Sequence, residues 1–119
     1  MKLISKIVTI IILCVFSMIS SATEAELDSK VISLMTTHND KFGGCMARLY
    51  DNIQTLLPEC GSNWVTFSCN GQFADEQRGT RMFDQAQLSL TANKSIKVTV
   101  DDQYKIEGYC FVKRIDIKN

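Results

Sequence analysis

The chain has few of the residues on which most enzymes and nucleic-acid-binding domains depend. It contains one histidine and one proline among 119 residues, and its 13 lysine and arginine residues are balanced by 13 aspartate and glutamate residues. Balanced charge leaves no basic face for phosphate groups, which argues against nucleic acid or a membrane surface as a partner. The length allows one small domain, which excludes a multidomain enzyme.

Catalytic and phosphate-binding constellations are also missing. His38 has neither a Gly-x-Ser-x-Gly elbow nor a free thiol to activate. The glycine pair at 43–44 lacks the partner residues of a phosphate-binding loop. The adjacent acids at 75–76 and 101–102 do not make a glycosidase couple, because neighbouring strand residues point to opposite faces. We therefore expect a protein that is not an enzyme and needs no cofactor.

The N-terminus has the pattern of an export signal. Lys2 and Lys6 precede an apolar run of 13 residues at 7–19, and Ser20-Ser21-Ala22 follows. The run is shorter than the roughly 20 apolar residues that a membrane-spanning helix needs. We expect cleavage after this small-residue segment, so that residues 1–22 are a signal peptide and residues 23–119 form a single exported α+β domain.

Four of the five cysteines remain in the expected mature chain, which has a formal charge of −2. An even number in an exported protein indicates two disulfide bonds, formed by Cys45, Cys60, Cys69 and Cys110. A metal site is disfavoured, because no C-x-x-C pair occurs. Two pairings stay open. A hairpin centred near residue 57 favours 45 with 69 and 60 with 110, and the alternative joins 45 with 60 and 69 with 110.

Hydrophobic periodicity predicts five strands and one helix. The strands are expected at 30–37, 45–50, 64–69, 96–100 and 109–117. A 3.6-residue period predicts a helix over 80–93, with Phe83, Ala86 and Leu90 toward the core. The order of three strands, one helix and two strands predicts a small disulfide-stapled α+β fold, either a mostly antiparallel sheet or an OB-like barrel.

The last two strands are expected to flank a polar turn or a longer hairpin tip at 101–108. In the final strand, one parity contains Tyr109, Phe111, Ile115 and Ile117. Alternation therefore predicts that these side chains share a face, with Lys113 as the one interruption.

Two polar segments are candidate binding surfaces. Residues 70–81 are expected to form a loop, and aromatic and arginine side chains in such loops are enriched at interface hot spots. The partner-binding candidates in this loop are Phe73, Asp75, Glu76, Arg78 and Arg81. Tyr104 and Glu107, at the expected hairpin tip, complete the set. The alternative for the loop at 70–81 is that Phe73 packs onto the core and the charges are solvated, and the alternative for the hairpin tip is an ordinary solvated turn.

Several short stretches carry a resemblance to known proteins. They are Thr66–Gly71, Met82–Gln87, Lys97–Asp102, Gly108–Cys110 and Arg114–Asp116. These stretches resemble a family of small exported gammaproteobacterial proteins, with Cys69 and Cys110 at the two motif cysteines. The turn at 104–107 departs from the usual basic, histidine-containing form. The whole chain is similar to periplasmic immunity proteins of type VI secretion systems, which neutralise VgrG-type peptidoglycan-hydrolase effectors.

The resemblance implies a periplasmic immunity protein, monomeric or homodimeric, whose partner is a cognate lysozyme-like toxin. Such a protein would inhibit the toxin by occluding its carboxylate-lined active cleft. The resemblance supplies no contact residues position by position. The alternative is an exported glycan-binding module, because the same order of elements occurs in toxin B-subunits.

Overall fold

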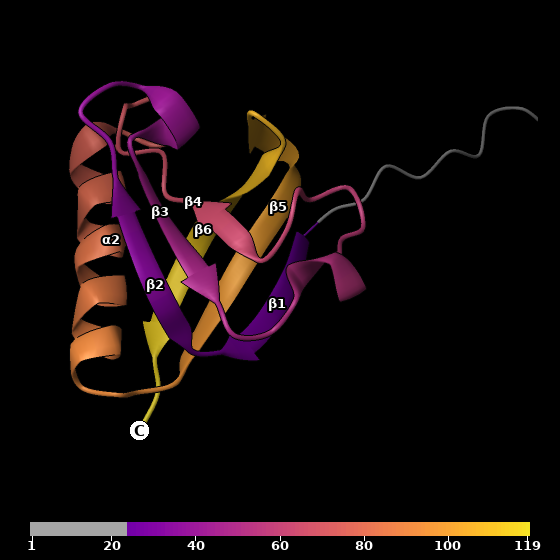
Figure 1. Ribbon diagram of the computed structural model, residues 1–119, viewed down its shortest axis with the longest axis vertical. Coiled ribbons are helices and arrows are strands. Elements are labelled where there is room, and N and C mark those ends of the chain that lie inside the picture. Colours follow the sequence, from indigo (N-terminus) through magenta and orange to yellow (C-terminus); the bar gives the residue numbers. More distant parts are fainter. Residues whose placement is uncertain (1–23) are drawn as a thin grey trace, which may run out of the picture.

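The structure is a computed structural model that describes residues 24–119. In this range the chain forms a six-stranded mixed sheet with one α-helix and two disulfide bonds (Figure 1). The α+β class is confirmed. The expected signal peptide, residues 1–22, lies outside the described residues. Within the described residues, no helix is long and apolar enough to cross a membrane.

The sheet has the strand order β1-β5-β6-β4-β3-β2. The elements, in chain order, are β1 (Glu24–Ser29), β2 (Val31–Thr36), the 3-10 turn η1 (Lys41–Gly43), β3 (Cys45–Leu49), the 3-10 turn η2 (Ile53–Thr55), β4 (Trp64–Thr66), α2 (Glu76–Thr91), β5 (Ile96–Ile106) and β6 (Tyr109–Ile117). All neighbouring strands are antiparallel except β4 and β6, which pair in parallel through Thr66 and Phe111.

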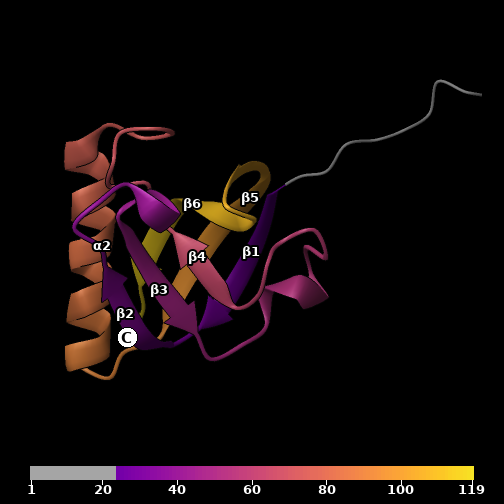
Figure 2. The same ribbon diagram turned by 45° about the horizontal axis from the view of Figure 1, so that its top comes forward.

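The two edge strands, β1 and β2, are consecutive in the chain and separated only by Lys30. Both views show them meeting at one corner (Figures 1 and 2). The Tyr50 N–H donates to the Lys30 carbonyl at 2.9 Å, and the Asp51 N–H donates to Ser29 Oγ at 3.0 Å. These bonds hold the corner, but β1 and β2 do not pair with each other in the described sheet. The sheet is therefore open, and the OB-like barrel is not supported.

Strand β1 is one more strand than the sequence analysis predicted. Its first five residues alternate acidic and apolar side chains, and Ala25 and Leu27 pack against the core while Glu24, Glu26 and Asp28 are exposed. This is the pattern of a half-buried strand. It was missed because it is short and lies directly beside the expected cleavage site.

One face of α2 packs against β2, β3 and β6. The residues that it buries are Gly79, Phe83, Ala86 and Ser89. Phe83 and Ala86 are confirmed as core positions, but Leu90 is 39% exposed. The prediction for Leu90 is wrong. From Gly79 the buried positions are spaced four, three and three residues apart, so the last buried residue of the helix is Ser89 and its neighbour Leu90 points outward. The Ser89 hydroxyl is satisfied by the Ala86 carbonyl at 2.7 Å.

The face assignment along β6 is also corrected by the structure. Cys110, Val112 and Ile115 belong to the main core, whereas Phe111 points to the other face. The register against β5 shifts where Thr99 opposes Arg114 and Val100 opposes Val112. The extra residue in this β-bulge is Lys113, and a bulge reverses the alternation beyond it.

The disulfides join Cys45 to Cys69 and Cys60 to Cys110, with Cα–Cα distances of 5.7 and 5.4 Å. This is the first of the two pairings considered from the sequence. The hairpin register from which this pairing was predicted is not the observed one. Ala47 opposes Val65, so the hairpin is centred one residue before the expected residue 57. Strand β4 ends at Thr66, and Ser68 has a φ of 55°, which redirects the chain so that residue 69 still reaches residue 45.

Candidate functional site

Two hollows flank the first turns of α2. One has a volume of about 470 Å³, and we call it the aromatic-basic pocket. Its lining residues are Phe73, Ala74, Asp75, Arg78, Arg81, Met82, Phe111 and Lys113. The other has a volume of about 350 Å³, and we call it the polar hollow. Its lining residues are Thr36, Thr37, His38, Asn39, Asp40, Gly44, Cys45, Cys69, Asn70, Glu76, Thr80 and Phe83.

Three aromatic rings meet at the aromatic-basic pocket. The ring centroid of Phe73 lies 5.3 Å from that of Tyr104 and 5.6 Å from that of Phe111, and the Tyr104–Phe111 distance is 6.4 Å. These separations are typical of tilted and edge-to-face aromatic pairs. Phe111 is buried, Phe73 is half-buried and Tyr104 is 43% exposed. Phe73 is therefore held in place by its neighbours while part of its surface still faces the pocket.

A distortion in β5 carries Tyr104 to this cluster. Asp101 opposes Phe111 and Lys105 opposes Cys110, so residues 102–104 have no opposing residues on β6. The carboxylate of Asp101, which is 4% exposed, accepts the Gln103 N–H at 2.8 Å and supports the bulged segment. A regular strand over the same residues would not place Tyr104 in this way, because a bulge re-aims the side chains beside it.

The helix begins earlier than the sequence predicts. Asp75 is its N-cap, and Asp75 Oδ1 accepts the Arg78 N–H at 2.8 Å. Residues 76–81 are therefore helical, which corrects the expected loop over 70–81 to a loop that ends at Asp75. As a result, Arg78 and Arg81 stand on a rigid element, one turn apart on the same side of α2.

Three cationic side chains surround the aromatic cluster. Arg78 pairs with Asp75 across 3.3 Å, but both side chains are largely exposed. Lys113 contacts Glu24 and lies 3.5 Å from Asp101, and the hydrogen bond to Glu24 raises the pKa of Lys113 above its ordinary value. Arg81 makes no ion pair or side-chain hydrogen bond with any other described residue. The pocket therefore combines an apolar base with positive charge.

The structure brings together five of the seven partner-binding candidates. Phe73, Asp75, Arg78 and Arg81 line the aromatic-basic pocket, and Tyr104 packs against Phe73. The remaining two lie elsewhere. Glu76 lines the polar hollow on the other side of α2. Glu107 is at the β5–β6 turn, where Glu107 Oε2 accepts the Phe42 N–H at 3.2 Å. Asp75 also has a structural task as the helix cap.

The sequence analysis did not select four of the lining residues, namely Ala74, Met82, Phe111 and Lys113. The sequence contains an indication of the site at Lys113, because this charged residue occupies a position where the alternation in the strand predicts an apolar one. Reading that interruption as a bulge would have moved Phe111 out of the core face and beside residues 73 and 104. Nothing in the sequence indicated Met82, because the helix was expected to begin only at residue 80 and the arginines before it were assigned to a loop.

These features define a small disulfide-bonded α+β domain with an aromatic-basic pocket beside its helix. Among residues 24–119, no group of three or more His, Cys, Asp or Glu side chains is placed to hold a metal ion. Comparison with protein-family models, curated proteins and solved structures finds no match for this chain.

Proposed function

We propose that this protein is a periplasmic immunity protein that binds and inhibits a peptidoglycan-degrading, lysozyme-like toxin. The observation that carries the proposal is the aromatic-basic pocket, in which Phe73 forms an apolar anchor beside Arg78 and Arg81. Aromatic and arginine side chains are the residues most enriched in interface hot spots. Their position on a capped helix and a packed ring cluster reduces the entropy lost on binding.

The charge of the pocket favours an acidic partner surface. Arg81 has no carboxylate partner among the described residues, and Arg78 pairs with Asp75 in an exposed geometry that contributes little to stability. A glycosidase cleft carries two carboxylates. In the proposed complex, Phe73 packs at the rim of such a cleft and Arg81 pairs with one of its acids, which blocks access of the glycan substrate.

Export is part of the same proposal. The two disulfides are typical of an oxidising compartment, and the expected signal peptide at residues 1–22 would deliver the chain to the periplasm. A version without residues 1–22 should fail to protect cells from a toxin that acts on the wall, because it stays in the reducing cytoplasm, away from the toxin and without its disulfides. Fractionation and N-terminal sequencing test this. Retention of Met1, or full protection without residues 1–22, would contradict the proposed localisation.

Calorimetric titration of the mature protein against the hydrolase domain of the cognate lysozyme-like toxin tests the inhibitory activity. We expect saturation and complete loss of wall hydrolysis near one equivalent, with a standard interface of about 1,600 Å² in total. Phe73→Ala and Arg81→Glu should each weaken binding by about 2 kcal/mol or more, because the proposal places both residues at the centre of the interface.

Lys94→Glu is the matched control for Arg81→Glu, because Lys94 is an exposed cation just beyond the end of α2. It should leave the affinity unchanged. Undiminished hydrolysis at tenfold excess of the mature protein would overturn the proposed function. Equal affinity of the Phe73, Arg81 and Lys94 variants would move the contact surface away from the pocket. Ultracentrifugation of the free protein should find a monomer or a homodimer.

A further inference from the structure

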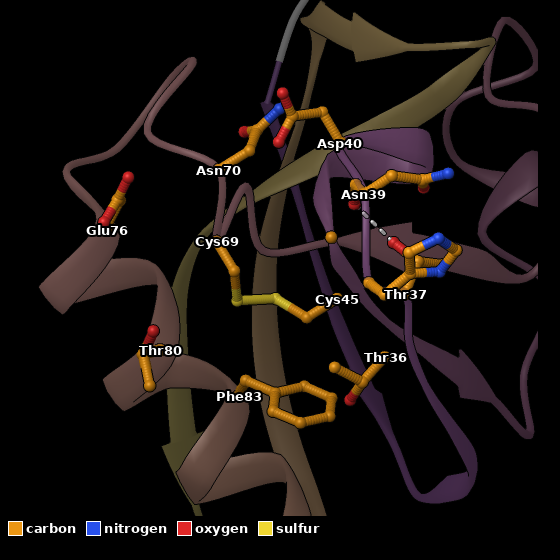
Figure 3. A pocket seen from close by; sticks show the side chains of 12 residues that line it. Thr36, Thr37, Asn39, Asp40, Cys45, Cys69, Asn70, Glu76, Thr80 and Phe83 are labelled. Atoms are coloured by element: carbon orange, nitrogen blue, oxygen red, sulfur yellow. Dashed lines mark hydrogen bonds between the residues drawn. A yellow bond between two sulfur atoms is a disulfide. The ribbon is translucent and has the colours of Figure 1, made fainter.

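The polar hollow lies on the opposite side of α2 from the aromatic-basic pocket, and the two hollows share no lining residue. Figure 3 shows the polar hollow with one wall formed by the segment that follows β2 and the other wall formed by α2. The Cys45–Cys69 disulfide crosses between the walls, and Phe83 lies below it. Its volume of about 350 Å³ lies within the range of small-molecule sites.

The chemistry of the lining selects a class of ligand. It provides hydroxyl groups, side-chain amides, two carboxylates and an imidazole, but no lysine or arginine. An anionic ligand would therefore meet Asp40 and Glu76 without a lysine or arginine to balance its charge. A purely apolar ligand would leave these polar groups without partners, which is costly once water is displaced.

Two of the amides are already oriented. The Oδ1 atom of Asn39 accepts the Lys41 N–H at 3.1 Å. The Oδ1 atom of Asn70 accepts hydrogen bonds from Ser68 Oγ and from the Gln72 N–H, both at 3.1 Å. With its amide oxygen engaged by its own loop, Asn70 has its amide nitrogen left to donate to a ligand. Figure 3 shows the Asn39 side chain directed away from Asn70 and α2.

The carboxylates are complementary to these donors. Among the described residues, Asp40 and Glu76 make no side-chain hydrogen bond or ion pair. Figure 3 shows Asp40 beside Asn70 above the disulfide, with Glu76 and Thr80 on the α2 wall. The hollow therefore offers acceptors and donors close together, over a floor of sulfur and aromatic carbon.

We infer that the polar hollow is a saccharide-binding site. A pyranose carries hydroxyl groups that donate to Asp40 and Glu76 and accept from Asn70, and its carbon-bound hydrogens can rest against the disulfide. Neither a simple cation nor a simple anion satisfies both sets of groups. Because this site shares no lining residue with the aromatic-basic pocket, it does not depend on the proposed inhibitory function.

Titration of the ¹⁵N-labelled mature protein, followed by NMR, tests this inference. The probes are methyl glucoside, N-acetylglucosamine, glucosamine and glucose 6-phosphate. A single sugar should bind with a dissociation constant on the order of millimolar, as small ligands do. We expect saturable shifts at 36–40, 69–70 and 76–80 with the neutral sugars, and weaker or no shifts with the phosphate.

Asp40→Asn and Thr80→Val should each reduce saccharide affinity, by about tenfold for the carboxylate. Asp84→Asn is the matched control, because Asp84 is an exposed acid of α2 outside the hollow. Thermal melting should show that all variants fold. The inference would be overturned by no saturable shift with any sugar, by shifts that map elsewhere, or by binding of glucosamine alone, which indicates only a cation site. Arg81→Glu should leave the sugar titration unchanged.

Discussion

Asp101 is a buried carboxylate whose main work is to support the backbone of the bulged segment. It is 4% exposed, accepts the Gln103 N–H at 2.8 Å and lies 3.5 Å from Lys113 Nζ. The Asp101 side chain therefore links the bulge of β5 to Lys113 of β6. Through these contacts, an acid outside the pocket lining supports the segment that carries Tyr104.

Replacing Asp101 tests whether its hydrogen bond to the Gln103 N–H stabilises the protein and positions the Tyr104 ring. Asp101→Ala removes the acceptor of the Gln103 N–H and should lower the free energy of unfolding by about 1–2 kcal/mol, whereas Asp101→Asn keeps an acceptor and should lose less. Urea unfolding measures the difference. NOEs between the Tyr104 and Phe73 rings should weaken in the alanine variant. Equal stability of both variants, with the NOEs intact, would refute this role.

Asp28 and Lys118 form a second pair that can be measured directly. Lys118 Nζ lies 3.0 Å from Asp28 Oδ1, and this hydrogen bond lowers the pKa of Asp28 below its ordinary value of 3.8. A lowered pKa in the folded state means that the pair contributes stability above pH 3.8 and loses it as the pH falls through the folded-state pKa. Both groups are exposed, so we expect the effect on stability to be small.

Lys118→Met should raise the pKa of Asp28 toward 3.8, as followed by the ¹³C carboxyl shift in an NMR pH titration. Lys94→Met serves as the control, since Lys94 makes no side-chain hydrogen bond or ion pair within residues 24–119. An unchanged Asp28 titration in the Lys118 variant would show that the contact does not persist in solution.

At the scale of the elements, local signals predicted the helix and most strands but not the irregularities that build the pocket. The span of β6 matches its expected span, β3 ends one residue early, and β2 is one residue shorter at each end. The bulges in β5 and β6 could not be predicted, because a bulge depends on the register with a partner strand. Phe111 and Tyr104 meet only through those bulges.

The helix start was misjudged for a related reason. Residues 70–81 were expected to form a loop because the segment is polar, and Gly79 lowers its helix propensity further. The structure shows why a glycine stands there. A Cβ at residue 79 would lie 2.8 Å from the carbonyl oxygens of Phe67 and Ser68. Close approach of α2 to the end of β4 therefore depends on the absence of a side chain.

Gly79→Ala should destabilise the protein although alanine is the better helix former. The gain in propensity is about 1 kcal/mol, but overpacking against fixed backbone costs about 1–3 kcal/mol, so we expect a net loss of about 1 kcal/mol in chemical denaturation. Gln85→Ala, at an exposed position of α2, should stay within about 0.5 kcal/mol of the parent. Higher stability of Gly79→Ala would contradict the close approach.

At the scale of the whole molecule, the disulfides tie both halves of the sheet to the loops that cross them. In the chain-entropy model, bridges with sequence separations of 24 and 50 residues contribute about 3.5 and 4 kcal/mol. Such amounts are a large part of the stability of a small domain. The two bridges differ in access, because Cys60 and Cys110 are buried while Cys69 is half-buried in the polar hollow.

A mild reductant should therefore open Cys45–Cys69 before Cys60–Cys110, since thiol-disulfide exchange requires access to a sulfur atom. Alkylation under native conditions followed by peptide mass spectrometry should label residues 45 and 69 first. Complete reduction should lower the melting temperature strongly. Equal labelling of all four cysteines from the earliest time points would show that the two bridges open together.

The corner at Lys30 also determines when the sheet can be completed. Strand β1 is the first strand of the described chain, yet its only neighbour is β5, with Ser29 opposite Ile96 and Glu24 opposite Asp101. The chain must therefore release β1 before its partner has been synthesised and hold it without a neighbour until nearly all residues are present. Pairings this distant in sequence raise the contact order and slow folding. A chain that stops before β5 leaves β1 without any strand to join. The sheet can therefore be completed only when β1, near the start of the described chain, meets β5, near its end.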